Sequence, residues 1–281
     1  MNEEVRAQLS KILDAEPRSI ERLHGGCIAE VYGVHLLDSK VVAKVDDRGD
    51  LRLESFMLTY LKDHSALPVP EVIHSSDTLL VLEYLPGSPQ TLQRAEPHAA
   101  ELFAALHEVR AEHYGLEKDT LIGPLPQPNP QTASWVDFFR EHRLLYMKRL
   151  ALESGNLPER LGDKLESLAQ DLLNLLDEPP HPSLIHGDIW SSNVLAQGGK
   201  ITGILDPALY YADAEMELAY ISLFSTFGQT FFERYAELRG VREGFDSRKG
   251  LYNLYPLLVH VALFGGGYAR RVEGVLRRFD Y

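Results

Sequence analysis

The 281-residue chain contains a single cysteine, Cys27, so it cannot form an internal disulfide. A chain without disulfides is typical of the reducing cytoplasm, and we expect a cytoplasmic protein. Basic residues are also scarce, because 28 Lys and Arg stand against 41 Asp and Glu, for a formal net charge of −13. Nucleic acids are bound through basic surfaces, so this balance argues against a nucleic-acid partner.

Long apolar runs are missing as well. The longest, from Leu254 to Phe264, is interrupted by Pro256 and His260 and is about half the length of a membrane span. The N-terminal segment is acidic and amphipathic, whereas a secretory signal has a basic start and an apolar middle. We therefore expect no membrane partner. The sequence also has no internal repeat, low-complexity tract or metal-type Cys/His cluster.

Polar residues at fixed spacing occur in the segment HGDIWSSNVLAQGGKITGILD, which begins at His186. Asp188 and Asn193 are five residues apart, as are the catalytic Asp and the Mg²⁺-binding Asn of protein kinases. Asp206 follows the apolar stretch 201–205, so we expect it at a strand end as a second Mg²⁺ ligand. Each residue alone is better explained as a helix cap or turn residue, and only the combination indicates a kinase.

Asp188 is the candidate catalytic base. It would take the proton of the acceptor hydroxyl while Asn193, Asp206 and the phosphates of ATP hold Mg²⁺. Gly187 stands where protein kinases have an arginine, which favours the small-molecule kinases. Trp190, two residues after Asp188, is a candidate substrate contact because its indole could cover the apolar face of a sugar, although core packing explains it equally well.

Residues further upstream match the other parts of an ATP site. Lys44 ends the apolar run VVAK and corresponds to the strand lysine that contacts the α- and β-phosphates. Glu54 lies on LESFMLTYLKDH, whose apolar residues recur at helical spacing, and would pair with Lys44. Isolated Lys and Glu residues are usually solvated surface charges, so it is the strand context that supports Lys44.

The turn within LHGGCIAEVYGVHLL, read as strand, turn, strand, is the least specific motif. Gly25 and Gly26 would let backbone amides approach the phosphates, but the full GxGxxG pattern is absent and paired glycines often mark an ordinary hairpin. Cys27 lies in the same turn. It is either a buried, inert thiol or a redox-sensitive one whose oxidation would impede ATP binding.

The order of predicted elements indicates two lobes. Residues 1–84 form a nucleotide-binding lobe with a small antiparallel sheet and one helix between its strands, and residues 85–281 form a larger, mostly helical catalytic and substrate-binding lobe. The run LLVLEYLPG marks the junction, where backbone groups of Glu83, Tyr84 and Leu85 would bind the adenine edge unless they form only an edge strand and turn. A further helix is expected over about the first 16 residues.

The segment GPLPQPNPQ is too rich in proline for regular structure, so we expect a rigid loop that forms one wall of the acceptor pocket. Trp135, Phe138, Phe139 and Arg143 follow at helical spacing. The aromatic residues are expected in the core. Arg143 would either pair with a nearby acidic residue or face an anionic substrate.

The chain resembles the fructosamine kinase family of ketosamine kinases in the segments GGCIAEVY, LPVPEVI, GPLPQPN, WVDFFREHRL, HGDIWSSNV, LDPALYYADAEMELAYISLF and LYNLYPLLVHVALFGGGY. That family is similar to aminoglycoside phosphotransferases. The resemblance runs through nearly the whole chain and implies a bilobal, protein-kinase-like α+β fold. It also implies ATP- and Mg²⁺-dependent phosphorylation of the sugar of a ketosamine, typically at the O3 hydroxyl, which destabilises the adduct and releases the amine in a protein-deglycation or metabolite-repair role.

Residue by residue, the resemblance implies Asp188 as base, Asn193 and Asp206 as metal ligands, and Lys44 with Glu54 as the phosphate-binding pair.

Two further features come with the resemblance. Glu215 and Glu217 resemble the acidic pair that follows the metal-binding Asp in this family, and we interpret them as anchors of the catalytic loop. Val259 and Ala262 stand where the family commonly has asparagines on either side of His260, which removes a polar contact to the substrate or within the lobe. His260, among apolar neighbours, is expected to be a hydrogen-bonded core residue.

Three functions stay open at this point. The first is a kinase of small-molecule or protein-linked ketosamines, active as a monomer or homodimer. The second is an aminoglycoside- or choline-type phosphotransferase that uses another hydroxyl acceptor. The third is a pseudokinase that acts as a nucleotide-dependent binding module.

Overall fold

The computed structural model describes residues 3–23, 29–46 and 51–281. By its internal contacts the chain divides into two compact units. Unit 1 consists of Met1–His98 and Ser191–Pro207, and unit 2 of Ala99–Trp190 and Ala208–Tyr281. The functional division between residues 84 and 85 stays a prediction, because compactness alone does not mark where nucleotide binding ends.

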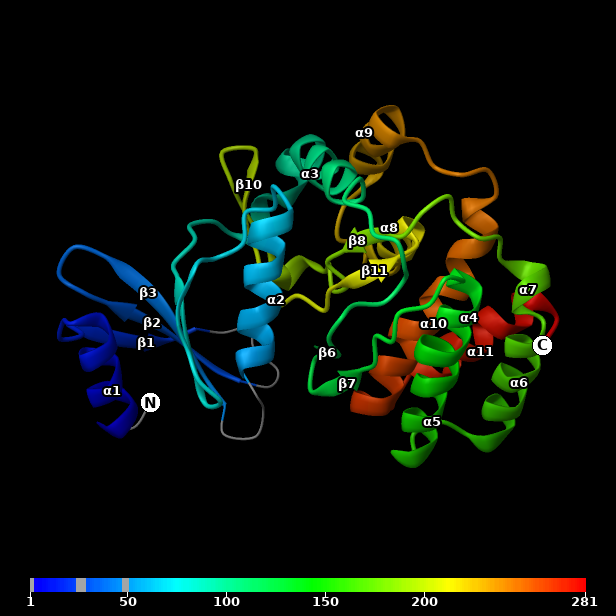
Figure 1. Ribbon diagram of the computed structural model, residues 1–281, viewed down its shortest axis with the longest axis horizontal. Helices are drawn as coiled ribbons and strands as arrows, with labels where there is room; N and C mark the ends of the chain where they lie inside the picture. Colours follow the sequence, from blue (N-terminus) through cyan, green and yellow to red (C-terminus); the bar gives the residue numbers. More distant parts are fainter. Residues whose placement is uncertain (1–2, 24–28, 47–50) are drawn as a thin grey trace. The chain divides into compact units, whose positions relative to one another are not determined.

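Unit 1 contains a five-stranded antiparallel sheet in the order β1-β2-β3-β5-β4 (Figure 1). The helix expected between its strands, α2, follows β3, and the helix expected at the start of the chain, α1, ends at Leu13. The elements are α1 (Glu3–Leu13), β1 (Ser19–Arg22), β2 (Glu30–His35), β3 (Lys40–Val45), α2 (Leu51–His64), β4 (Val72–Ser75) and β5 (Leu79–Glu83).

The central strands of this sheet bury one face against α1. Side chains alternate between the two faces of a strand, so Val41 and Ala43 of β3 lie on the same face. They form a core with Leu9 of α1, which is fully buried and contributes about 2 kcal/mol. The same alternation directs Lys44 to the opposite face of the sheet. The rest of this core comes from Val34, Leu79 and Val81.

A second antiparallel pair completes unit 1. It joins β9 (Val194–Gln197) to β10 (Lys200–Ile204) and follows the 3₁₀ turn Ser191–Asn193. Ser88 and Ala196 exchange backbone hydrogen bonds of 3.0 and 3.3 Å, which attach this hairpin to the chain that leaves β5. Gly87 has φ +141°, and a Cβ there would lie 3.0 Å from the Ala196 nitrogen, so this close approach requires glycine.

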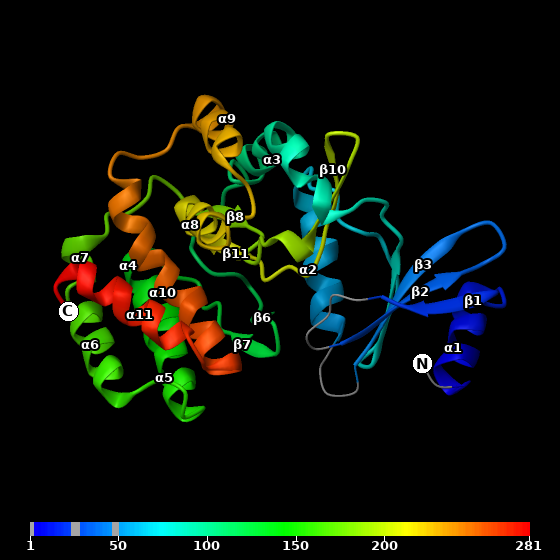
Figure 2. The same cartoon turned by 180° about the vertical axis from the view of Figure 1, so that it is seen from behind.

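Unit 2 is mostly helical, and α10 packs against α5, α8 and α11 (Figure 2). Helix α3 (Leu92–Leu106), preceded by the 3₁₀ turn Pro89–Thr91, begins in unit 1 and ends in unit 2. The helical segments of unit 2 are α4 (Trp135–Phe139), a π-helical segment (Arg140–Leu145), α5 (Tyr146–Glu153), α6 (Glu159–Gln170), α7 (Leu172–Leu175), α8 (Ala214–Phe224), α9 (Gln229–Arg239), α10 (Phe245–Phe264), α11 (Tyr268–Leu276) and the 3₁₀ turn Arg277–Phe279.

Two short antiparallel pairs lie in unit 2. Strand β8 (Ser183–Ile185) pairs with β11 (Tyr210–Ala212), and β6 (Thr120–Ile122) pairs with β7 (Leu125–Gln127). The prediction that GPLPQPNPQ forms only a loop was therefore wrong. Alternate residues of an antiparallel pair direct their N–H groups outward, and after the two-residue turn Pro126 occupies such a position, so its missing N–H costs no ladder hydrogen bond.

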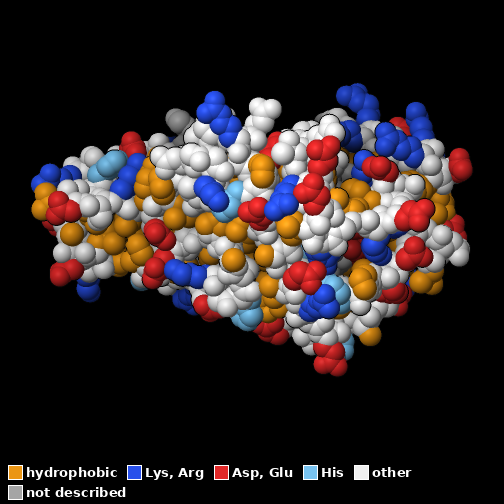
Figure 3. Space-filling view, turned by 90° about the horizontal axis from the view of Figure 1, so that it is seen from above, with side chains coloured by type: hydrophobic (Ala, Val, Ile, Leu, Met, Phe, Trp, Pro, Cys, Tyr) orange, Lys and Arg blue, Asp and Glu red, His pale blue; other side chains and the backbone are white. Residues whose placement is uncertain are grey.

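Helix α10 continues through Pro256, which the sequence suggested as an interruption, yet no helix within the described parts of the chain is both long and apolar enough to cross a membrane. On the face shown in Figure 3, acidic and basic side chains of the described residues are interspersed and do not gather by sign.

Candidate functional site

The ammonium of Lys44 contacts two carboxylates within unit 1. Lys44 lies on β3 and Glu54 in the first turn of α2, and their Nζ and Oε1 atoms are 2.5 Å apart. The same ammonium donates a hydrogen bond to Asp206 Oδ1. The predicted Lys44–Glu54 contact is present, and Asp206, which is 162 residues away in sequence, joins it.

Burial and the neighbouring charges shift the pKa values of Lys44 and Glu54. Burial by itself would lower the pKa of the Lys44 ammonium, but the carboxylates of Asp206 and Glu54 outweigh it and raise the pKa above its usual range. Lys44 is therefore a fixed positive charge at neutral pH. Burial also raises the pKa of Glu54, and Lys44 opposes that rise. A buried cation aimed by two carboxylates is suited to bind phosphate oxygens.

Asn193 and Asp206 lie at the same end of the β9–β10 hairpin. Asn193 directly precedes β9, and Leu205 and Asp206 directly follow β10, whose residue Ile204 pairs with Val194. The Leu205 N–H donates to the Asn193 carbonyl oxygen at 2.9 Å, which extends the pairing by one residue. Asp206 has φ +53°, a left-handed conformation that Asp tolerates better than most residues.

The chemistry of these two side chains fits Mg²⁺. Among the described residues no three His, Cys, Asp or Glu side chains form a metal cluster, so an all-carboxylate or imidazole site is not indicated there. Mg²⁺ instead commonly uses one or two protein oxygens together with substrate phosphates and water. One carboxylate, from Asp206, and one amide oxygen, from Asn193, match that set, and the ion itself stays a prediction.

The predicted adenine-binding segment follows the end of β5. Glu83 is the last residue of β5, and its N–H donates to the Glu71 carbonyl oxygen at 2.9 Å, so this N–H is already used within the sheet. The Tyr84 ring is 37% exposed and lies under the Lys40 ammonium, 4.3 Å from it. Leu85 contacts the hairpin at Gly203. Adenine binding by these residues stays a prediction.

In unit 2, Glu217 of α8 contacts the backbone of the loop that carries Asp188. The Glu217 carboxylate accepts hydrogen bonds from the N–H groups of His186 and Gly187, at 3.2 and 2.7 Å. It also contacts His107 Nε2 at 2.9 Å, and its side chain is 1% exposed. The interpretation of Glu217 as an anchor of this loop is confirmed by these contacts.

Gly187 has a steric reason to be glycine. Its φ is +85°, and a Cβ at this position would overlap the carbonyl oxygen of Ala208. Ala208 is held in place by a 2.8 Å hydrogen bond from its N–H to the His186 carbonyl oxygen. Any side chain at Gly187, including the arginine of protein kinases, would therefore displace this backbone crossing.

We predict that Glu217→Gln lowers the free energy of unfolding by about 2 kcal/mol, because the amide NH₂ replaces one of the two accepting oxygens and leaves one of the backbone N–H donors of His186 and Gly187 unsatisfied. Urea unfolding followed by circular dichroism measures this value. The matched control is Glu237→Gln, since Glu237 is an exposed residue of α9 that contacts only Arg234 among the described residues. Its expected change is within about 0.5 kcal/mol. Equal stability of both variants would show that Glu217 does not anchor the loop.

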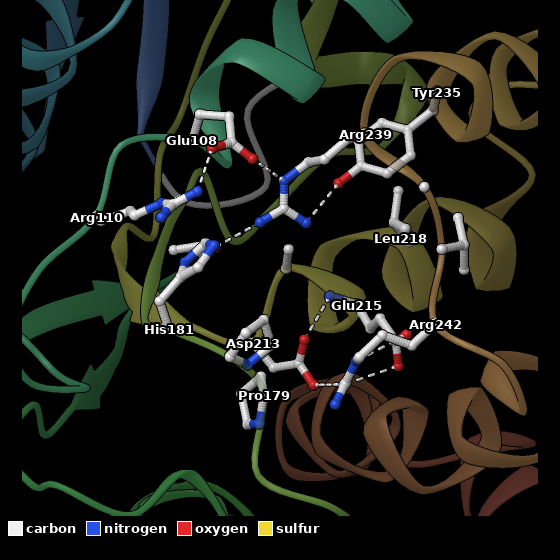
Figure 4. A pocket seen from close by; sticks show the side chains of 15 residues that line it. Glu108, Arg110, Pro179, His181, Asp213, Glu215, Leu218, Tyr235, Arg239 and Arg242 are labelled. Carbon is white, nitrogen blue, oxygen red and sulfur yellow. Dashed lines mark hydrogen bonds and ion pairs between the residues drawn. The ribbon is translucent and has the colours of Figure 1, made fainter.

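Glu215 has a different role from the one suggested by the sequence. It contacts Arg242 and Arg248, with Arg248 Nε and Nη2 each 2.9 Å from its carboxylate. This ion-pair cluster, which also includes Asp213, borders a pocket of about 480 Å³ at the start of α8 (Figure 4). The prediction that Glu215 anchors the catalytic loop was wrong, because the chain turns at Asp213 and directs Glu215 toward α10.

The remaining charges of this pocket are also neutralised internally. Arg239 lies between Glu108 and Tyr235, and its Nε is 2.9 Å from the Glu108 carboxylate (Figure 4). Arg110 contacts the same carboxylate at 2.7 Å. Burial lowers the pKa of His181, which favours its neutral form. Each guanidinium described in the lining thus contacts a carboxylate, and the pocket is a structural cluster of paired charges.

Arg143 pairs with no acidic side chain in the part of the chain that the structure describes. It is fully buried, and its guanidinium donates to the Pro128 carbonyl oxygen at 2.8 Å and to Asn129 Oδ1 at 2.6 Å. The guanidinium lies 3.8 Å from the centre of the Tyr210 ring, a cation–π contact. Arg143 therefore fixes the proline-rich segment to the core of unit 2, a role that the sequence pattern did not reveal.

A second unpredicted contact is made by Tyr220 of α8, whose hydroxyl donates to Asp188 Oδ1. Tyr220 lies three residues after Glu217, so both point from one face of α8 toward the same loop. This helical spacing is the signal that could have identified Tyr220 from sequence.

The other candidates have mixed outcomes. Gly25, Gly26 and Cys27 lie outside the described residues. Trp190 is half-buried, and its contact with substrate stays a prediction. His260 is hydrogen-bonded, as expected, because its Nδ1 is 2.8 Å from the Pro256 carbonyl oxygen, and burial lowers its pKa.

Known proteins resemble the chain over its full length. A profile of the family described as fructosamine kinase matches residues 1–279. A Synechocystis sp. protein with the name "Probable ketoamine kinase" is 36% identical over 279 residues, which cover 94% of this chain and 90% of that protein. A Thermobifida fusca crystal structure that bears the name fructosamine-3-kinase superposes with a TM-score of 0.88 at 30% identity and covers 99% of this chain and 98% of its own.

A more distant structure shares the fold alone. Aminoglycoside phosphotransferase APH(4)-Ia superposes with a TM-score of 0.71 at 18% identity, covering 98% of this chain and 99% of its own. The protein-kinase-like α+β fold expected from the sequence is confirmed by these likenesses.

Proposed function

Because the chain belongs to the fructosamine kinase family, we propose that it transfers the γ-phosphoryl group of ATP to a sugar hydroxyl of a ketosamine, at O3. The family makes it a phosphotransferase with ATP as phosphoryl donor. The observation that carries the proposal is the contact of Lys44 with both Glu54 and Asp206, together with the family match over residues 1–279. Free and protein-linked fructosamines and ribulosamines are the acceptor class.

Each residue has a separate part in this reaction. Asp188 takes the proton of the acceptor hydroxyl as its oxygen attacks the γ-phosphorus, and the bond between that phosphorus and the β,γ-bridging oxygen breaks to release ADP. Lys44 binds the α- and β-phosphates, and Glu54 fixes the direction of the ammonium. Asn193 and Asp206 hold Mg²⁺, which neutralises the charge on the phosphate oxygens when it is bound. Trp190 covers the apolar face of the sugar.

The two other functions have less support. The structural likeness to an aminoglycoside phosphotransferase is at 18% identity, so it supports the same fold but does not indicate the same acceptor. A pseudokinase typically lacks part of the phosphate- and metal-binding set, whereas Lys44, Glu54 and Asp206 are all present and in mutual contact. Both alternatives make different predictions for the same assay.

The decisive experiment is a coupled ADP-release assay across a panel of acceptors. The panel contains free and lysine-linked fructosamine, free and lysine-linked ribulosamine, kanamycin and choline, each with and without Mg²⁺. We expect Mg²⁺-dependent turnover on the ketosamines alone, and ³¹P and ¹H NMR of the product should place the phosphate on O3.

Turnover on kanamycin or choline without ketosamine activity would replace this function by the second one. ATP binding without any turnover would establish the pseudokinase. Phosphate on another hydroxyl of the ketosamine would keep the acceptor class and correct the position of attack.

A further inference from the structure

Tyr220 contacts the carboxylate of Asp188, the proposed base. It lies in the second turn of α8 and is 6% exposed. Its hydroxyl donates to Asp188 Oδ1. Its ring packs against Phe224 at 4.8 Å between centroids, and Phe224 in turn packs against His260 at 5.0 Å. The phenol is therefore held in one direction by a row of rings.

In the hydrogen bond between Tyr220 and Asp188, the phenol of Tyr220 is the donor. Burial, reinforced by the adjacent carboxylate of Asp188, raises the pKa of Tyr220 well above its ordinary value. Tyr220 is therefore protonated at neutral pH and is the donor in this hydrogen bond.

The same contact limits how the Asp188 carboxylate can rotate. A terminal carboxylate has a broad torsional preference and two equivalent oxygens, so without a partner either oxygen could face the acceptor. Tyr220 binds Oδ1 from α8, while the loop beneath is fixed by Glu217 on the same helix face. Tyr220 therefore restricts the directions in which this carboxylate can face the acceptor hydroxyl.

We propose that Tyr220 is a positioning residue that fixes the Asp188 carboxylate for proton removal from the acceptor. This inference rests on the proposed function, in which Asp188 is the base. It names no new substrate, and it assigns to α8 a direct part in the chemical step beyond its part in holding the loop.

The test is Tyr220→Phe, which removes only the hydroxyl and keeps the ring against Phe224. We expect kcat for ketosamine phosphorylation to fall about tenfold, with KM for ATP and for the acceptor within about twofold, because a misaligned base affects the chemical step more than binding. The melting temperature and ATP affinity establish that the variant is folded. Tyr114→Phe is the matched control, since Tyr114 is a buried tyrosine whose hydroxyl bonds only the Pro179 carbonyl oxygen among described residues, and its kcat should be unchanged.

A double-mutant cycle with Asp188→Asn separates positioning from a general structural effect. If Tyr220 acts through Asp188, Tyr220→Phe should produce no further loss of the residual rate in the Asp188→Asn background. An unchanged kcat in Tyr220→Phe, or an equal loss in both backgrounds, overturns the inference while Asp188 keeps its role. If Asp188→Asn itself keeps the wild-type rate, Asp188 is not the base and the inference falls with that assignment, whereas the proposed function fails only if the wild-type protein does not phosphorylate ketosamines, so the two failures are distinguished.

Discussion

Asp188→Asn is expected to lower kcat for ketosamine phosphorylation by about a thousandfold while ATP binding stays near the wild-type value. The amide has almost the shape of the carboxylate, so the loop should keep its hydrogen bonds to Glu217. What is lost is the carboxylate to which we assign removal of the acceptor proton. The γ-phosphate contacts lie elsewhere, in our assignment on Lys44, Asn193 and Asp206, which is why the affinity for nucleotide should be spared.

The measurement pairs a discontinuous phosphate-transfer assay with isothermal titration of ATP. The control is Asp163→Asn, an exposed residue of α6 whose side chain has no partner among the described residues, and it should leave both quantities unchanged. If Asp188→Asn lost ATP affinity in parallel with kcat, the residue would belong to the nucleotide site. If it kept kcat, a different base would have to be sought.

The proximity of the candidate phosphate- and metal-binding residues was predictable because local patterns fix their surroundings. Lys44 ends a run whose alternation defines a strand, and the helical period around Glu54 defines a helix that packs on the same sheet face, so their contact follows from two short-range patterns. Asn193 and Asp206 flank the hairpin β9–β10, and the ends of a hairpin are necessarily adjacent. In both cases the geometry is set within a few residues of the site.

The contacts that sequence reasoning missed depend on long-range packing. Arg143 is a charged residue at full burial, and the rule that charges stay at the surface or pair with opposite charges gave the wrong alternatives. Its partners are carbonyl oxygens and aromatic faces brought together from separate segments. Glu215 and Glu217 have different partners for a similar reason. Side chains two residues apart on a helix point to nearly opposite sides, so Glu217 faces the loop and Glu215 faces α10.

Helix α8 supplies the side chains of unit 2 that hold the loop carrying Asp188. Glu217 fixes the backbone on the N-terminal side of Asp188, and Tyr220 fixes the side chain of Asp188 itself. The start of the helix is in turn held by the Glu215 ion pairs with Arg242 and Arg248.

Lys44→Ala should have the second large effect, and it should act on binding as well as on the chemical step. The substitution removes the only cation that the described residues place between Glu54 and Asp206, whose carboxylates would then repel each other and also the incoming phosphates. We expect kcat/KM for ATP to fall about a hundredfold, with an increase in KM and a decrease in kcat together.

The control for Lys44→Ala is Lys62→Ala, which removes a lysine of α2 that pairs with Glu71 at the surface and should leave ATP kinetics unchanged. Combining Lys44→Ala with Glu54→Gln tests the cause, because neutralising the second carboxylate relieves the repulsion and should restore part of the lost ATP affinity, although not kcat. An ATP affinity that is indifferent to Lys44→Ala and to Asp206→Ala alike would mean that the nucleotide phosphates bind elsewhere, whatever the acceptor proves to be.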